Sequence, residues 1–129
     1  MILLDTDVMI DLLRQYQPAV EWLASLGEEE IVLPGFLVME LIQGCRNRAE
    51  QEKVERELSV YSIMWPSSEV CNEALSIFAH YHLSYGIRIL DALIGQMAAD
   101  LDVPLYTFNQ KHYTPIPSLK MAQPYKKDI

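Results

Sequence analysis

Short apolar runs, bounded by polar or turn-forming residues, recur along the chain and predict five β-strands. The runs cover residues 2–4, 31–33, 60–64, 103–108 and 119–122. Runs of this length that are rich in aliphatic and aromatic residues are typical of strands in a protein core.

The segments between these runs carry apolar residues at helical spacing and predict six helices. We expect these helices at residues 8–15, 19–26, 36–45, 50–58, 68–83 and 87–100. Thr6 or Asp7 suits the cap of the first helix, Pro18 suits the first turn of the second, and Gly27 would end it.

Strands that alternate with helices predict a mostly parallel sheet covered on both faces by helices. The expected fold is therefore a three-layer α/β/α sandwich, formed as a single domain by residues 1–129. In such sheets, ligands bind beyond the carboxyl ends of the strands, where the strand order reverses. Asp5 and Asn109 both follow predicted strands and are candidates for this position.

The composition narrows the class of protein. Half of the 129 residues are hydrophobic, enough for one buried core, and no apolar run approaches the roughly 20 residues that span a bilayer. The first apolar run lacks a basic flank and is interrupted by Asp5, so we expect no signal peptide and a cytoplasmic protein. Cys45 and Cys71 have no partners at metal-site spacing, which predicts reduced thiols.

The formal net charge of -8 argues against binding nucleic acid through general electrostatic attraction. Any chemistry on nucleic acid must therefore depend on local features. The mixed charges of residues 50–57 are typical of a solvated helix face, with electrostatic selection of a partner as the alternative.

Three acidic residues occupy positions where the surrounding pattern is apolar. Asp5 ends the first apolar run, and helical periodicity places Glu40 and Asp91 on apolar stripes, so both are expected to point inward toward the sheet. Two like charges about 4 Å apart repel by about 4 kcal/mol at an effective dielectric constant of 20. Either the three carboxylates are scattered, or a cation holds them together.

Each acid also has a simpler interpretation. Asp5 suits a helix N-cap, Glu40 suits an exposed helix face, and Asp91 suits the first turn of a helix, where the dipole favours it. Taken together, they favour a site for Mg²⁺ or Mn²⁺, which prefer oxygen ligands. Such an ion polarises a phosphoryl oxygen and activates water, which is the chemistry of phosphodiester hydrolysis.

Four segments, in this order and spacing, give the chain a recognisable signature. They are Leu3–Asp7 with Ile10 and Asp11, Val38–Leu41, Leu90–Ile94 and Leu105–Tyr113. With these segments the chain resembles the PIN-domain ribonucleases, in particular the toxins of the VapC type from bacterial and archaeal toxin-antitoxin pairs. The resemblance extends over nearly the whole length.

The resemblance implies a metal-dependent endoribonuclease whose acidic site is Asp5, Glu40 and Asp91, with Mg²⁺ or Mn²⁺ as cofactor. It places Asn109 at a fourth position and gives Thr6 and Thr107 supporting roles. It also implies a homodimer that is inhibited by a cognate antitoxin. The family often has Asp at the fourth position, and Asn there is a weaker ligand or a water-positioning amide, which argues against a permanently occupied second metal.

Some residues near these motifs keep more than one interpretation. Arg88 pairs with Asp91, with a substrate phosphate, or in a plain surface salt bridge. Asp7 either joins the site or caps the first helix, whereas Asp11 is expected to be a solvated helical residue. Lys111 is a candidate contact for RNA.

The remaining histidines and aromatic residues are less informative. His112 is a candidate contact for RNA or a local hydrogen-bonding residue, and His80 and His82 are expected to be structural. Tyr16, Trp22 and Leu26 suit the core, or the contact with an antitoxin where they are exposed.

Two other functions compete with the nuclease. Asp5-Thr6-Asp7 after a strand also resembles the start of haloacid-dehalogenase-type phosphatases, but the second half of the chain lacks the late acidic pair of that class. The other alternative is a catalytically weak scaffold that binds RNA or a partner protein, with Asn109 as a sign of an eroded metal site.

Overall fold

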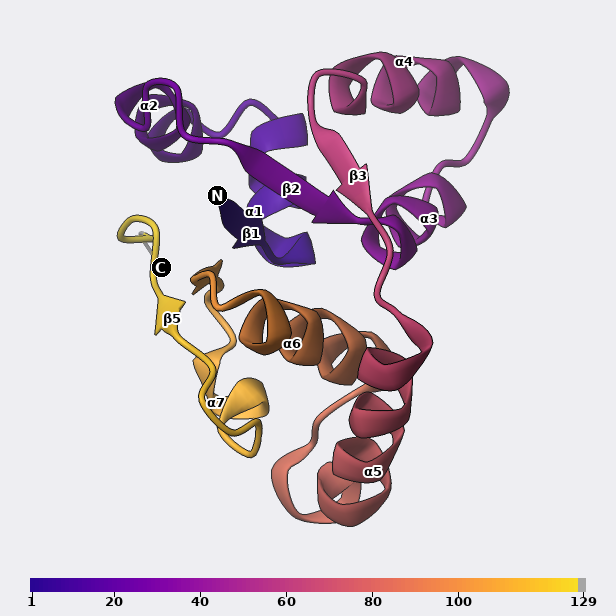
Figure 1. Ribbon diagram of the computed structural model, residues 1–129. Coiled ribbons are helices and arrows are strands. Elements are labelled where there is room, and N and C mark those ends of the chain that lie inside the picture. The colour runs from indigo at the N-terminus through magenta and orange to yellow at the C-terminus, as the bar shows by residue number, and fades with distance from the viewer. Residues whose placement is uncertain (128–129) are drawn as a thin grey trace.

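Twelve helices and strands make up residues 1–127, the part of the chain that the computed structural model describes (Figure 1). In chain order they are β1 (Ile2–Leu4), α1 (Thr6–Leu13), α2 (Gln17–Ser25), β2 (Ile31–Pro34), α3 (Gly35–Gln43), α4 (Arg48–Leu58), β3 (Ser62–Met64), α5 (Ser68–Tyr85), α6 (Ile89–Leu101), β4 (Leu105–Tyr106), α7 (Gln110–Tyr113) and β5 (Met121–Ala122).

The strands form one parallel sheet in the order β3-β2-β1-β4-β5. Strand β1 pairs with β2 on one side, where Ile2 lies opposite Ile31, and with β4 on the other, where Leu3 lies opposite Leu105. The strand order therefore reverses beside β1. In parallel sheets this reversal opens a crevice at the carboxyl ends of the strands, here those of β1 and β4.

Helices cover both faces of the sheet. Ile2, Leu3 and Leu4 are all buried, although successive side chains of a strand point to opposite faces, so neither face of β1 meets solvent. This burial and the all-parallel pairing confirm the predicted three-layer α/β/α fold.

Helix α6 packs closely against Tyr113 and Ile116. A Cβ atom at Gly95 would lie 2.9 Å from the ring of Tyr113 and 2.2 Å from the side chain of Ile116. Only glycine therefore allows these two buried side chains to pack directly against the backbone of α6.

The predicted helices and strands are all found within the described residues, with shifted ends. The strand predicted at 103–108 shrinks to Leu105–Tyr106, and α7, a single turn, was missed because four residues are too few to show a helical period. Helix α1 begins at Thr6, so its N-cap is Asp5 and not Thr6 or Asp7. The simpler interpretation of Asp5 is thus confirmed, although it does not exclude a second role.

Asp11 is not the solvated residue that the sequence suggested. Its side chain is only 14% exposed, because it accepts a hydrogen bond of 2.6 Å from the Tyr125 hydroxyl and lies 2.9 Å from the Lys127 ammonium. Tyr125 also packs near Phe108, Tyr16 and Trp22. The C-terminal segment around Tyr125 and Lys127 therefore packs against α1 and the end of β4.

No helix in residues 1–127 is both long enough and apolar enough to cross a membrane. Cys45 and Cys71 form no disulfide, as predicted, and both are partly buried.

Candidate active site

Asp5 lies where β1 passes directly into α1, and it is almost completely buried. One carboxylate oxygen accepts a hydrogen bond of 2.7 Å from the Thr6 amide, and the other accepts one of 2.7 Å from the Thr107 hydroxyl. Thr107 follows β4, the neighbour of β1, so pairing of the two strands brings together residues that are 102 positions apart. Asp5 is held from two sides.

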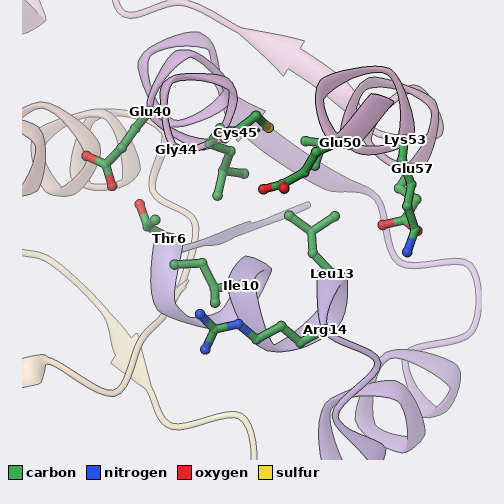
Figure 2. A pocket seen from close by; sticks show the side chains of 12 residues that line it. Thr6, Ile10, Leu13, Arg14, Glu40, Gly44, Cys45, Glu50, Lys53 and Glu57 are labelled. Atoms are coloured by element: carbon green, nitrogen blue, oxygen red, sulfur yellow. Dashed lines mark hydrogen bonds between the residues drawn. The ribbon is translucent and has the colours of Figure 1, made fainter. Parts of the chain in front are cut away.

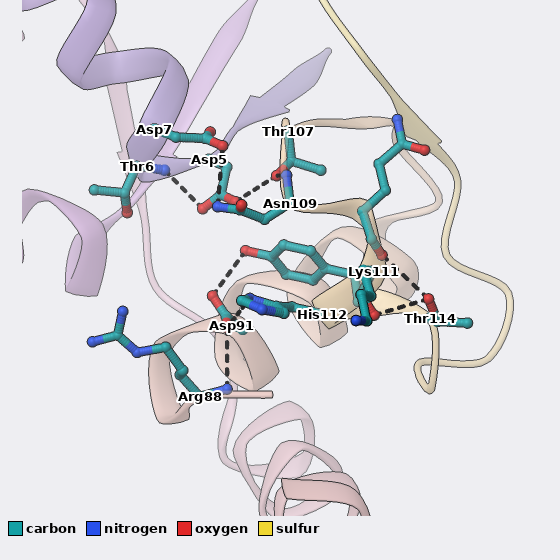
Figure 3. Close-up of polar contacts among 12 residues, drawn as sticks. Asp5, Thr6, Asp7, Arg88, Asp91, Thr107, Asn109, Lys111, His112 and Thr114 are labelled. Atoms are coloured by element: carbon teal, nitrogen blue, oxygen red, sulfur yellow. Dashed lines mark hydrogen bonds and ion pairs between the residues drawn. The ribbon is translucent and has the colours of Figure 1, made fainter. Parts of the chain in front are cut away.

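Asp91 lies in the first turn of α6, and its carboxylate is held by three neighbours (Figure 3). Its Oδ2 atom accepts a hydrogen bond of 3.1 Å from the Arg88 amide and lies 3.7 Å from Nδ1 of His112. Its Oδ1 atom accepts a hydrogen bond of 3.4 Å from the hydroxyl of Tyr113. Asp91 therefore points inward, as its apolar stripe predicted.

Asp7 and Asn109 meet at the same edge of the sheet. The Asn109 side-chain amide donates to Asp7 over 3.2 Å, and the Phe108 amide donates to the same oxygen over 3.0 Å. The Asn109 backbone amide donates to the Thr107 hydroxyl, which itself donates to Asp5 (Figure 3). Thr107 thus links the fourth position to Asp5, in keeping with a supporting role.

Glu40 departs from its prediction. It is exposed, whereas Leu37 and Leu41 of the same helix are buried, so it lies at the edge of the apolar stripe of α3 and not toward the sheet. Among residues 1–127, no side-chain hydrogen bond or ion pair restrains it. Glu40 is nevertheless on the same cleft as the other acids.

The cleft has a volume of about 740 Å³ and lies at the predicted edge of the sheet. Its lining includes all of the predicted site residues except the buried Thr107, namely Asp5, Thr6, Glu40, Arg88, Asp91 and Asn109, together with Asp7. The Arg88 side chain makes no ion pair among the described residues and remains available at the cleft wall. The structure therefore brings these residues to one concave surface.

Burial and mutual repulsion shape the charge of the cleft. Burial raises the pKa of Asp5, which the Thr107 and Thr6 hydrogen bonds partly offset, while the negative charge of Asp91 raises it further. Burial and then the nearby Asp5 raise the pKa of Asp7 to about 6. The anions are tolerated because Asp5 and Asp91 each lie at a helix N-terminus, whose dipole favours negative charge.

The donors suit a hard divalent cation. The cleft presents carboxylate and amide oxygens, the ligands of Mg²⁺ and Mn²⁺, and Mg²⁺ commonly uses one or two carboxylates and completes its shell with water. No three acidic, His or Cys side chains of residues 1–127 stand close enough to enclose an ion unaided. Asp5 and Asp91 are the acids held in place at the cleft, and the exposed Glu40 would have to turn inward to join them.

No role at this site was predicted for Tyr113. It belongs to the segment Leu105–Tyr113, but an aromatic residue after a predicted strand is typical of a protein core. The proximity of His112 to Asp91 was also not predicted, because both depend on the unpredicted turn α7.

A second hollow adjoins the cleft between α1, α3 and α4, with a volume of about 410 Å³. It shares Thr6, Ile10 and Glu40 with the cleft. In Figure 2 the Glu40 carboxylate and the Thr6 hydroxyl point toward each other at one end, while Arg14 and Glu50 lie farther along. An extended molecule in this groove would reach the acidic cleft.

Comparisons with known proteins agree with this geometry. The family model of the PIN domain matches residues 2–114. A protein of Mycobacterium tuberculosis named Ribonuclease VapC10 is 31% identical over 122 residues, which cover 93% of this chain and 91% of that protein.

Solved structures share the fold at lower identity. A toxin-antitoxin complex from Klebsiella pneumoniae matches with a TM-score of 0.78 and 22% identity over 98% of this chain and all of the matched chain. VapBC2 from Rickettsia felis, bound to a promoter DNA fragment, matches with a TM-score of 0.78 and 21% identity over 95% of this chain and 98% of the other.

Proposed function

Because this chain belongs to the PIN-domain family, we propose that it is a metal-dependent endoribonuclease and the toxin of a toxin-antitoxin pair. The observation that carries the proposal is the cleft beside β1 and β4, which collects Asp5, Asp91, Asp7, Asn109 and Glu40 in a chain related to a named ribonuclease. The phosphatase alternative is set aside because a different family matches residues 2–114.

The proposed roles follow from how firmly each side chain is held. Asp5 and Asp91 are the inner ligands of Mg²⁺ or Mn²⁺, since both are partly or fully buried and held by neighbours. Glu40 completes the acidic triad from the cleft mouth. A bound ion of this kind supplies positive charge to the phosphoryl oxygen and lowers the pKa of its water.

The protein's other groups position the substrate. Arg88 offers a guanidinium to an RNA phosphate, since its side chain makes no ion pair in the described residues and such pairs are strong and directional. Glu40 orients the attacking water by accepting its hydrogen bond at a carboxylate oxygen. Asn109 keeps Asp7 in place through its amide, which makes the fourth position a structural support more than a ligand.

RNA cleavage by the purified protein, free of any antitoxin, tests the proposal. We expect cleavage of single-stranded RNA with Mg²⁺ or Mn²⁺ and none after chelation. Asp91→Asn should lose cleavage, whereas Asp100→Asn, an exposed change on the same helix, should keep it. A folded wild-type protein that binds RNA without cutting it at any metal concentration would support the scaffold alternative instead.

The proposed partners fit two further surfaces. The groove of Figure 2 suits an antitoxin segment, because it runs from mixed charges on α4 to the acidic cleft and would block the cleft when filled. A separate apolar hollow of about 320 Å³ on α5 and α6, with Leu75 and Ile89 exposed, suits the second copy of a homodimer.

We further propose that residues 1–129 form a single domain that acts in the cytoplasm. Growth arrest on expression of the chain, relieved by co-expression of a small neighbouring gene, would support the toxin assignment. Equilibrium sedimentation of the purified chain tests the dimer.

A further inference from the structure

Tyr113 is fully buried, yet its polar end reaches the charged cleft. Its ring packs against α6 in the space that Gly95 leaves free, and its hydroxyl donates to Oδ1 of Asp91 over 3.4 Å. Phenylalanine would fill the same space. A buried hydroxyl is unfavourable unless it is hydrogen-bonded, so its contacts with the acids are the feature that distinguishes tyrosine here.

The same hydroxyl also lies near Asp5, and burial and then the negative charges of Asp5 and Asp91 raise the pKa of Tyr113. The other hydrogen bonds of these two acids come from separate directions, since Thr6 and Thr107 hold Asp5 while the Arg88 amide holds Asp91. Within residues 1–127, the Tyr113 hydroxyl is the side-chain donor to Asp91 Oδ1. It therefore restrains one oxygen of Asp91 beside a second acid, Asp5, whose negative charge repels it.

We propose that Tyr113 is a positioning residue of the nuclease, which aligns the Asp91 carboxylate for the metal through its hydroxyl. This inference rests on the proposed function. A carboxylate has about four acceptor sites, so the bonds from Tyr113 and the Arg88 amide still leave Asp91 acceptor sites for an ion and its waters. Groups that orient metal ligands in this way are commonly worth about 10- to 100-fold in affinity or activity.

The decisive variant is Tyr113→Phe, which removes only the hydroxyl. Tyr61→Phe is the matched control, because Tyr61 is partly buried and lies between α4 and β3, outside the lining of the cleft. Calorimetric titration of the RNA-free protein with Mn²⁺ measures metal affinity directly. We expect about 10- to 100-fold weaker Mn²⁺ binding for Tyr113→Phe and no change for Tyr61→Phe.

Two further readouts separate positioning from general stability. The Mn²⁺ concentration for half-maximal RNA cleavage should rise by the same factor, and saturating Mn²⁺ should restore most of the rate. A merely structural role would lower the rate at every Mn²⁺ concentration and lower the unfolding temperature without metal.

Equal Mn²⁺ affinity of Tyr113→Phe and the wild type would overturn the inference while leaving the nuclease intact. If the wild type itself binds no Mn²⁺, the proposed metal site fails, and the role of Tyr113 fails with it.

Discussion

Asp91 and Glu40 reach the same cleft from two helices, but they are held very differently. Asp91 lies in the first turn of α6, where the helix dipole favours a negative charge, and the Arg88 amide and the Tyr113 hydroxyl restrain its two oxygens. Glu40 lies in the last turn of α3, where the dipole disfavours it, and it is exposed without a side-chain partner in residues 1–127.

The difference divides the cleft into a fixed side, whose side chains are held by neighbours, and a free side, whose side chain has no partner in residues 1–127. The fixed side is Asp5, Asp91 and Asp7, with their supports Thr107 and Tyr113; the free side is Glu40. A rigid pair of carboxylates suits an ion that must be held in one place. An unrestrained carboxylate can turn toward RNA and water when they are present, so substitutions on the two sides should have different effects.

The largest effect is expected on the fixed side, at Asp5. Asp5→Asn keeps a good N-cap for α1 but removes a charge from the proposed ion site, so the rate of RNA cleavage should fall about 1000-fold, corresponding to several kcal/mol of lost transition-state stabilisation. Mn²⁺ binding should fall with it. The metal-free variant should lose little stability, because removing a buried charge offsets the loss of one of the two hydrogen bonds that the carboxylate accepts.

Thermal unfolding in the presence of a chelator provides the control for that variant. A marked loss of stability would mean that the rate had fallen through damage to α1. Retained cleavage in a folded Asp5→Asn protein would remove Asp5 from the site.

Glu40→Gln should separate the two sides. We expect cleavage to slow about 100-fold, the usual contribution of a group that positions or deprotonates water, while Mn²⁺ affinity stays close to that of the wild type. Glu52→Gln on the solvated face of α4 is the matched control. If Glu40→Gln weakens Mn²⁺ binding as much as Asp91→Asn does, Glu40 is a ligand as firm as the others and the division between the sides is wrong.

This division also explains what the sequence could and could not predict. Asp5 was found because an acid after an apolar run marks a strand end, and Asp91 because its apolar stripe is wide and truly buried. Glu40 lies at the edge of the apolar stripe of α3. A periodicity of 3.6 residues does not show whether a residue at such an edge is buried or exposed.

The contacts that restrain the fixed side could not be predicted from the sequence, because they join residues that are far apart in the chain. Asp5 meets Thr107 across 102 positions, and Asp7 meets Asn109 across 102. The alternation of strands and helices predicted the sheet that makes such contacts possible, but not which side chains would make them. Tyr113 depends in addition on the single turn α7, which has no periodic signature.

The free energy of unfolding should also depend on pH, because negative charges on the fixed side are buried and close together. The raised pKa of Asp7, about 6 against 3.8 in an unfolded chain, means that the folded protein binds this proton more tightly. Its contribution to stability is therefore complete below about pH 3.8 and is lost as the pH rises through about 6. The pKa of Asp5 is raised as well, so Asp5 also makes the folded protein less stable as the pH rises.

Denaturant unfolding in a chelator, at pH values on both sides of this window, measures that cost. Between these values, the wild type should lose on the order of 2 kcal/mol more than Asp7→Asn. Parallel stability curves for the two proteins would show that Asp7 is already solvated and that the fixed side carries no such penalty.

The smallest effect concerns whether the fixed side depends on the C-terminal segment behind it. Tyr125→Phe removes a hydrogen bond to Asp11, for which Lys127 remains as a partner, so the free energy of unfolding should fall by about 1 kcal/mol. Mn²⁺ affinity should not change, because Asp5 and Asp91 are held by α1, β4 and α7 and not by this segment. Tyr85→Phe, an exposed change on α5, is the control. A fall in Mn²⁺ affinity together with stability would show that Tyr125, through its contact with Phe108, extends the fixed side to the end of the described chain.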